Sequence, residues 1–221
     1  MAPTSRERVL AAAMAEFAAR GFDGATVDRI AERAGLNKAM LYYHFPGKAA
    51  LYREILREVF AGVADAVDAI RRGDQPPDAQ LRAFVSTVAA EAVARPHFPN
   101  LWLREMADGG RHLDAPIVDA LARVLGALTG ILRDGERAGL FRRANPFVTH
   151  LGIVSPLLMF AATAGVREKF GGRLAPAVAR LDRDAAVRQV QDATLAALAP
   201  TPAARRRVRL RSPRRGRRST P

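Results

Sequence analysis

Two lysines and three hydrogen-bonding aromatic residues lie close together in one short stretch of the chain. They are Lys38, Tyr42, Tyr43, His44 and Lys48. Ammonium, phenol and imidazole groups can donate hydrogen bonds to phosphate oxygens or to base edges, so this combination indicates binding to nucleic acid. Both lysines fall in the first turn of a predicted helix, where a cation opposes the helix dipole unless an anion such as phosphate is near. The alternative is that both tyrosines pack against a preceding helix while both lysines stay solvated.

The residues around them predict two short helices joined by a tight turn. In the first, apolar residues recur at helical spacing at Val27, Ile30, Ala31 and Ala34. Thr26 is a favourable N-cap for that helix, and Gly35 can adopt the positive φ at which a helix ends. Asn37 can cap a second helix that begins at Lys38, and Pro46 ends it after about two turns. This pattern is typical of a helix-turn-helix.

The segment GFDGATVDRIAERAGLNKAMLYYHFPGKAALYREIL, residues 21–56, resembles the DNA-binding domain of the TetR/AcrR family. The resemblance covers roughly the first quarter of the chain. It implies an all-α homodimeric regulator, with an N-terminal three-helix helix-turn-helix domain and a C-terminal helical domain for ligand binding and dimerisation. The expected division is residues 1–47 for DNA binding, residues 48–199 for effector binding and dimerisation, and residues 200–221 as a disordered basic tail.

The resemblance also implies which side chains contact double-stranded DNA. In such proteins the residues that match Lys38, Ala39, Met40 and Tyr42 face base edges. The residues that match Thr26, Tyr43, His44 and Lys48 approach the sugar-phosphate backbone. Alanine and methionine offer only apolar contacts, for example to thymine methyl groups, so the sequence of the operator does not follow from them.

Apolar residues at helical spacing predict further helices at residues 5–20, 48–72, 78–95, 97–107, 113–140 and 182–198. Gly21 is expected to end the first, and the helix from residue 48 is expected to link the two domains. Residues 144–166 carry no formally charged side chain, but their polar residues and prolines argue against a membrane span. We expect there a buried or dimer-forming helix that is kinked near Pro156. By resemblance, the last two helices pair with their copies in a four-helix dimer interface.

Composition argues against several kinds of chemistry. The chain contains no cysteine, so disulfides and thiolate metal sites are excluded. Its four histidines are far apart and no glycine-rich phosphate loop occurs, so we expect no metal, no cofactor and no enzyme. Glu91, Glu105 and Asp108 are interpreted as surface or salt-bridged acids rather than as a carboxylate site. No secretory signal opens the chain, and a cytoplasmic protein without a membrane partner is expected.

Aromatic residues and methionines in the middle of the chain indicate where a small, largely apolar effector would bind. The predicted ligand-binding residues are Phe84, His97, Phe98, Trp102, Met106, Ser155 and Met159. Ligand pockets are mostly apolar and contain a few polar groups that orient the guest. The alternative is that aromatic residues and methionines at helical spacing form an ordinary core.

The net charge of +13 is concentrated near the C-terminus, where residues 200–221 hold nine arginines and no acid. This tail is either a nonspecific DNA-binding arm or a solvated segment of no consequence. The predicted function is a ligand-responsive regulator, by resemblance a repressor, that binds a palindromic operator as a dimer. The alternatives are a sequence-neutral nucleoid-type DNA-binding protein and a scaffold whose helical domain binds protein. Selection from random DNA sequences distinguishes the regulator from the nucleoid-type protein, because only the regulator enriches a single palindrome.

Overall fold

The computed structural model describes residues 2–174, 178 and 181–200. Among these residues the chain is helical, as predicted, and no strand occurs. The helices are α1 (Ser5–Gly24), α2 (Val27–Ala34), α3 (Lys38–His44), α4 (Lys48–Arg72), α5 (Pro77–Ala94), α6 (Phe98–Ala107), α7 (Ala115–Arg137), α8 (Pro146–Ala162), α9 (Ala164–Leu174) and α11 (Arg183–Leu198). Apart from Pro200, the predicted basic tail lies outside the described residues.

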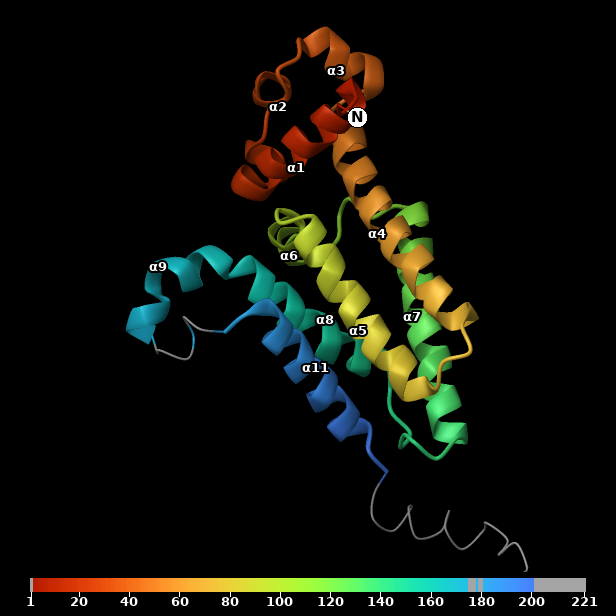
Figure 1. The fold of residues 1–221 in the computed structure, drawn as a ribbon. Coiled ribbons are helices and arrows are strands. Elements are labelled where there is room, and N and C mark those ends of the chain that lie inside the picture. Colours follow the sequence, from red (N-terminus) through yellow and green to blue (C-terminus); the bar gives the residue numbers. More distant parts are fainter. Residues whose placement is uncertain (1, 175–177, 179–180, 201–221) are drawn as a thin grey trace, which may run out of the picture.

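Figure 1 shows α1, α2 and α3 gathered at one end of the molecule, a part that we call the head. The α4 helix begins in the head and runs into a larger group of helices, α5 to α11, which we call the body. At 25 residues, α4 spans about 37 Å. A continuous cluster of buried side chains extends from Val9 in α1 to Leu198 in α11 and includes Leu51, Ile55 and Val67 of α4. The α4 helix therefore belongs to both parts.

Side-chain caps set the boundaries of α2 and α3. The Thr26 hydroxyl accepts a hydrogen bond from the backbone N–H of Arg29 at the start of α2. Gly35, with φ of 63°, adopts the left-handed conformation that ends α2. The Asn37 side chain accepts a hydrogen bond from the backbone N–H of Met40, 2.8 Å away, and so caps α3. The predicted helix-turn-helix is confirmed.

The α1 helix extends beyond its predicted end at residue 20. Gly21 interrupts the helical geometry with φ of 71° and ψ of 176°, but one further turn follows to Gly24. This turn places the Phe22 ring 6.0 Å from the ring of Phe17 and 5.3 Å from that of Tyr52, measured between centroids. The extra turn is stable because its aromatic side chain packs against α1 and α4.

The bend predicted near Pro156 is in the wrong place. Pro156 lies inside α8, and the helix ends at Thr163 instead, where α9 turns away by 51°. The Thr163 hydroxyl donates to the Met159 carbonyl, 2.6 Å away, and the Arg167 guanidinium donates to the Phe160 carbonyl. These side chains occupy carbonyls of the last turn of α8, and such local hydrogen bonds compete with continuation of a helix.

Two parts of the body are long and apolar enough to cross a membrane by length and composition alone. One is α7, and the other is α8 together with residues 164–170, if this bent pair is counted as one span. The α7 helix buries Ile117, Leu128 and Ile131 in the body core. It also forms ion pairs with α4 through Arg123 and Asp134. We therefore interpret α7 as a core helix, since core helices of folded domains meet the same criterion.

Candidate nucleic-acid interface and effector cavity

The outer face of α3 presents aromatic and apolar side chains to solvent. Tyr43 is 82% exposed, Tyr42 48% and Met40 38%, and Ala39 is also exposed. Leu41, on the opposite side of the helix, is fully buried. The alternative in which both tyrosines pack against a preceding helix is therefore wrong. A short helix anchored on one side and open on the other has the form that enters a major groove.

Lys38 lies at the start of this exposed face and is paired within the chain. Its ammonium is 2.9 Å from a carboxylate oxygen of Asp28 in α2. The hydrogen bond to Asp28, together with the charge of that carboxylate, raises the pKa of Lys38. The ion pair is exposed, and exposed pairs exchange readily with other partners. Lys38 can therefore leave Asp28 for a phosphate or a base edge.

Two more of the predicted DNA-contacting residues stabilise the head as well as facing outward. The His44 ring nitrogen Nε2 lies 2.7 Å from the Ser5 hydroxyl, which connects the end of α3 to the start of α1. Thr26 is exposed and uses its hydroxyl to cap α2. Both residues therefore help to position the helix-turn-helix, in addition to their predicted contacts with DNA.

Lys48 lies on the inner side of the head. Its ammonium donates to the backbone carbonyls of Phe22, at 2.8 Å, and of Ala25, at 3.1 Å. It also lies over the Phe22 ring, 4.5 Å from the centroid. These contacts occupy carbonyls between α1 and α2, so Lys48 braces the segment that leads into the helix-turn-helix. Its predicted contact with the DNA backbone would require some of these hydrogen bonds to be given up.

A buried carboxylate–histidine pair at the junction of head and body was missed by the sequence interpretation. Glu105 of α6 was expected to be a surface or a salt-bridged acid, and the surface interpretation is wrong because it is only 1% exposed. Its two carboxylate oxygens accept hydrogen bonds from the backbone N–H and from Nδ1 of His112, both at 2.8 Å. The spacing of seven residues across the Gly109–Gly110 turn is the only sequence signal for this pair.

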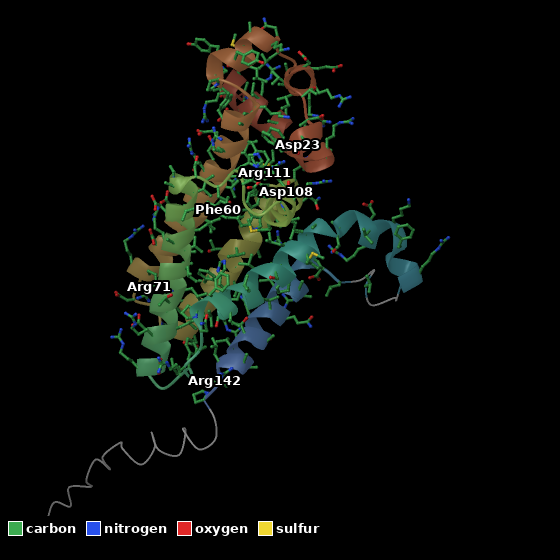
Figure 2. The ribbon with its side chains drawn as sticks, turned by 180° about the vertical axis from the view of Figure 1, so that it is seen from behind. Asp23, Phe60, Arg71, Asp108, Arg111 and Arg142 are labelled. Carbon is green, nitrogen blue, oxygen red and sulfur yellow. The ribbon has the colours of Figure 1, made fainter. Side chains whose placement is uncertain are left out.

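The loop after α6 rests on the last turn of α1. The His112 ring lies 4.1 Å from the ring of Phe22 and 4.7 Å from that of Tyr52, between centroids. Burial, and then the nearby Glu105 carboxylate, raise the pKa of Tyr52, so its phenol stays protonated. Arg111 donates to Asp23 at 2.7 Å, and Figure 2 shows these two residues beside Asp108 where head and body meet. We call this set of contacts the α1–α6 junction.

The second connection between head and body runs along α4 and α7. Arg57 of α4 pairs with Asp114, the N-cap of α7, at 2.5 Å. Further along the two helices, Arg123 pairs with Asp65 and Asp68 at 2.7 and 2.5 Å. Near their far ends, Arg71 pairs with Asp134 at 2.8 Å. We call this contact, with the apolar side chains buried between the helices, the α4–α7 junction.

A cavity of about 70 Å³ lies among α4, α5, α6, α7 and α8. Its walls are apolar, with Phe60 edge-on to Trp102 at 4.7 Å between ring centroids. Its polar lining consists of Glu91, which pairs with Arg95, and His150. Atom Nδ1 of His150 is buried without a hydrogen-bond partner among the described residues, and burial lowers the pKa of its ring. The imidazole is therefore neutral near pH 7, and its Nδ1 is available for a hydrogen bond.

The predicted ligand-binding residues do not all meet at this cavity. Phe98 and Trp102 line it. Phe84 is fully buried in the core, 6.3 Å from the His150 ring between centroids, and is not part of the lining. The others lie at exposed positions outside it, namely His97, Met106, Ser155 and Met159. They are separated because helical spacing in the sequence does not show which face of each helix turns inward.

Comparison with known proteins agrees with both parts of this structure. Residues 9–55 match the profile described as bacterial regulatory proteins, tetR family, and residues 77–190 match the one described as tetracyclin repressor-like, C-terminal domain. The chain is 29% identical over 143 residues to the HTH-type transcriptional repressor NicS of Pseudomonas putida, covering 64% of this chain and 68% of NicS. It is 26% identical over 141 residues to the HTH-type transcriptional regulator RutR of Escherichia coli, covering 64% of this chain and 66% of RutR.

Solved structures show the same fold. A regulatory protein of the tetR family from Rhodococcus RHA1 has a TM-score of 0.71 at 20% identity, with 90% of this chain and 98% of that chain covered. A mutant of HlyIIR, described as a hemolysin II transcriptional regulator, has a TM-score of 0.67 at 25% identity, with 89% and 98% covered.

The two profiles cover the helix-turn-helix and most of the body, and the second alone spans just over half of the chain. The curated relatives are transcriptional regulators that carry a helix-turn-helix, which agrees with the exposed α3 of this head. A DNA-binding regulator of transcription, and not an enzyme, is the function that these relatives indicate. The chain belongs to the tetR family of bacterial regulatory proteins.

Proposed function

We propose that the chain is a ligand-responsive repressor that binds a palindromic operator as a dimer in the cytoplasm. The observation that carries this proposal is the outer face of α3, where Met40, Tyr42 and Tyr43 are exposed on a helix anchored by Leu41. Aromatic and apolar side chains gathered on one exposed face mark an interaction surface. A nearby lysine that is held only by an exposed ion pair adds the positive charge that DNA attracts.

Within this surface we assign two roles. Lys38, Ala39, Met40 and Tyr42 contact base edges, because they lie along the face of α3 that is open to a groove. Thr26 and Tyr43 contact phosphates. Arg29 joins them, since it is exposed at the start of α2 and forms no ion pair with the described residues. His44 and Lys48 act mainly by holding α3 and the preceding segment in place.

The surface for a second copy of the chain lies on α8 and α11. Four apolar side chains of α8 are exposed: Phe147 by 56%, Val148 by 65%, Leu151 by 45% and Met159 by 51%. A contiguous apolar face on a monomer is typical of a homodimer interface. A Val148→Glu, Leu151→Glu double variant is expected to be monomeric by light scattering. A dimer that persists in this variant would place the interface elsewhere.

Selection from random DNA sequences tests the operator. We expect one enriched palindrome, with half-sites placed so that two α3 helices meet major grooves about 34–36 Å apart. Enrichment of no sequence would instead support the sequence-neutral DNA-binding protein. A monomer that binds one half-site tightly would contradict the dimeric proposal.

The effector site is the cavity between Phe98, Trp102 and His150. At about 70 Å³ it is smaller than the dry cavity of about 150 Å³ that admits benzene, so an effector must push a wall outward. We propose a compact, largely apolar effector with one group that hydrogen-bonds to Nδ1 of His150. Its body would press on Phe98 and Trp102, both of α6.

Displacement of α6 reaches the head through the α1–α6 junction. Glu105 moves with α6, His112 moves with Glu105, and the Phe22 ring rests on His112. An effector shifts the equilibrium only by its difference in affinity for the two arrangements. A preference of about 2.7 kcal/mol for the arrangement that does not bind DNA lowers operator affinity about a hundredfold.

The single tryptophan makes the effector site directly testable. Compounds are screened for a saturable change in Trp102 emission, and those found are tested for release of the enriched operator. His150→Leu is expected to weaken their binding about tenfold, since one hydrogen bond is lost. His97→Ala, at an exposed position outside the cavity, serves as the control. Release of DNA by a compound that leaves Trp102 emission unchanged would place the effector elsewhere.

For the basic tail, which lies outside the described residues, we propose a nonspecific DNA contact. Its nine arginines have no acid among them and must attract phosphates at low salt. Truncation after Ala199 is expected to keep the same enriched palindrome and to reduce the salt dependence of nonspecific binding. A changed palindrome, or loss of the dimer, would show that the tail has a structural role.

A further inference from the structure

A second and larger hollow, of about 270 Å³, lies among α5, α8, α9 and α11. Five of its lining residues are alanines: Ala89, Ala92, Ala161, Ala164 and Ala186. Methyl groups cannot fill the space where four helices meet, so the hollow stays open. Its volume is close to the lower limit of about 300 Å³ for small-molecule sites, or about nine water molecules at liquid density. The hollow therefore has room for a small organic molecule.

Among the described residues, the charged side chains that line this apolar hollow are both cationic, Arg167 of α9 and Arg183 of α11. Atom Nη1 of Arg167 donates to the Phe160 carbonyl and to the Thr163 hydroxyl, while its guanidinium carbon lies 3.7 Å from the centroid of the Phe160 ring. These contacts fix the plane of the guanidinium. Among the described residues the partners of the Arg167 guanidinium are the Phe160 carbonyl, the Thr163 hydroxyl and the Phe160 ring, and none of them is a carboxylate. A guanidinium has five N–H donors, so donors remain for a planar anion.

Arg183 also contributes positive charge to the hollow, but more weakly than Arg167. It begins α11, and its Nε lies 3.0 Å from the carboxylate of the adjacent Asp184. That pair is exposed, with both side chains more than half accessible, so Asp184 screens Arg183 only partly. An apolar hollow with cations of two helices at its edge is complementary to a molecule that has an apolar body and one negative head.

We propose that this hollow is a binding site for an amphipathic monoanion, a carboxylate on a short alkyl chain or a ring. The alkyl part lies between the alanines of α5 and α11, beside Phe160. The carboxylate lies at Arg167, whose Nε–H and Nη2–H groups have the spacing for two parallel hydrogen bonds. Arg183 of α11 adds positive charge to the lining.

This site differs from the effector cavity in its lining and in its charge. The two hollows have only Ala92 of α5 in common. The effector cavity has a neutral imidazole as its free polar group, whereas the second hollow has two cations. The proposed anion site therefore does not depend on whether an effector binds beside Trp102 or whether the head binds an operator.

Calorimetric titration of the full-length protein with octanoate, in the absence of DNA, tests the proposal. 1-Octanol and octylammonium serve as probes with the same chain and a neutral or positive head. Octanoate is expected to bind at least about tenfold more tightly than either, because a charge-assisted bidentate contact is available to it alone. Its affinity should fall as salt is added. Equal affinities for the three probes would overturn the proposal.

Three variants locate the site. Ala89→Leu fills the hollow and is expected to abolish octanoate binding, while Arg167→Gln and Arg183→Gln should each weaken it, the former about tenfold or more. Arg188→Gln, an exposed arginine of α11 outside the lining, is the matched control and should have no effect. Circular dichroism shows whether each variant is folded. If loss of the Arg167 contacts disturbs α8, Arg183→Gln alone tests the contribution of the positive charge. Octanoate binding that survives Ala89→Leu would refute the site.

Discussion

The α4–α7 junction and the α1–α6 junction connect the same two parts of the molecule by different means. Along α4 and α7, ion pairs at three levels flank a row of buried apolar side chains. The contact between α1 and α6 is smaller, and in it the rings of Phe22 and His112 pack together beside polar contacts of Arg111 with Asp23 and of His112 with Glu105. An extensively packed contact resists relative displacement, whereas a smaller one can open locally at lower cost.

This difference indicates how the head can move. The α4 helix is held to α7 along its length, so the two are expected to move as one body. Rearrangement of the head is then expected to be concentrated at the α1–α6 junction. The α6 helix connects this junction to the effector cavity, which it lines together with α4 and α7. Variants that weaken one junction or the other test this difference.

Leu128→Ala is expected to have the largest effect on stability. Leu128 is fully buried in α7, between the residues that pair with α4. Removal of a buried leucine side chain typically costs about 2–5 kcal/mol, through lost apolar contact and the remaining cavity. Urea unfolding followed by circular dichroism measures this loss. Val118→Ala, 50% exposed on the same helix, should change the free energy of unfolding by less than about 0.5 kcal/mol. Similar losses for the two variants would show that α7 is not tightly packed.

Glu105→Ala is expected to destabilise the smaller junction by about 1–3 kcal/mol, because it leaves the buried backbone N–H of His112 without an acceptor. Glu105→Gln is the matched control. Its amide oxygen can still accept from that N–H, and its NH₂ can donate to Nδ1 if the His112 proton moves to Nε2. Hydrogen exchange should show faster exchange at residues 105–114 and at the end of α1 in Glu105→Ala only. Faster exchange spread over α4 and α7 as well would contradict the separation of the two junctions.

Asp114→Ala is expected to cost about 0.5–2 kcal/mol at neutral pH, as for loss of an N-cap, and it also removes the partner of Arg57. Burial by itself would raise the pKa of Asp114, but hydrogen bonds from Arg57 and from the backbone N–H of Ile117 outweigh it and lower that pKa. Because the pKa of Asp114 is lower in the folded protein, its carboxylate stabilises the fold above about pH 3.9, the pKa of an aspartate in the unfolded chain. This stabilisation is lost as the pH falls below that value. Unfolding at pH 7 and at pH 3 should therefore show a smaller difference between wild type and variant at the lower pH. A difference that grows on acidification would mean that Asp114 is not stabilised as a carboxylate.

The predictable parts of this molecule are those set by neighbouring residues. Thr26, Gly35 and Asn37 define the helix-turn-helix within twelve positions, and the structure has caps and a left-handed glycine at those places. The exposed face of α3 follows from one buried leucine and the helical period. The bend was expected at Pro156 because the prediction weighed only the proline. The chain bends after α8 instead, where Thr163 and the more distant Arg167 occupy carbonyls of the last turn.

The less predictable parts are those assembled from several helices. Glu105 was expected at the surface or in a salt bridge, and its burial was not predicted, since a single acid on a helix has no visible partner in the sequence. Its burial depends on how α6 packs between α1 and α8, which no local pattern specifies. Likewise Phe98 and Trp102 line the effector cavity while Met106 does not, because the rotation of α6 about its axis decides which side chains face inward.

The smallest expected effect on stability, and the most specific one on function, comes from a pair of arginine variants. Arg111→Ala removes the exposed ion pair with Asp23 at the α1–α6 junction, and Arg123→Ala removes exposed pairs with Asp65 and Asp68 at the α4–α7 junction. Exposed pairs contribute little to stability, so both variants should unfold close to wild type. Their effects on regulation should differ.

The measured quantity is the ratio of operator affinities without and with a compound that releases DNA from the wild type. Arg111→Ala should change this ratio by about twofold or more, since Arg111 connects the loop that follows α6 to the segment before the helix-turn-helix. Arg123→Ala should leave the ratio unchanged, because buried apolar contacts still hold α4 to α7. A change of equal size in both variants would mean that the α4–α7 junction also moves when the effector binds. No change in either would mean that the Arg111–Asp23 pair does not carry the coupling, and that it passes through Glu105 and His112 alone.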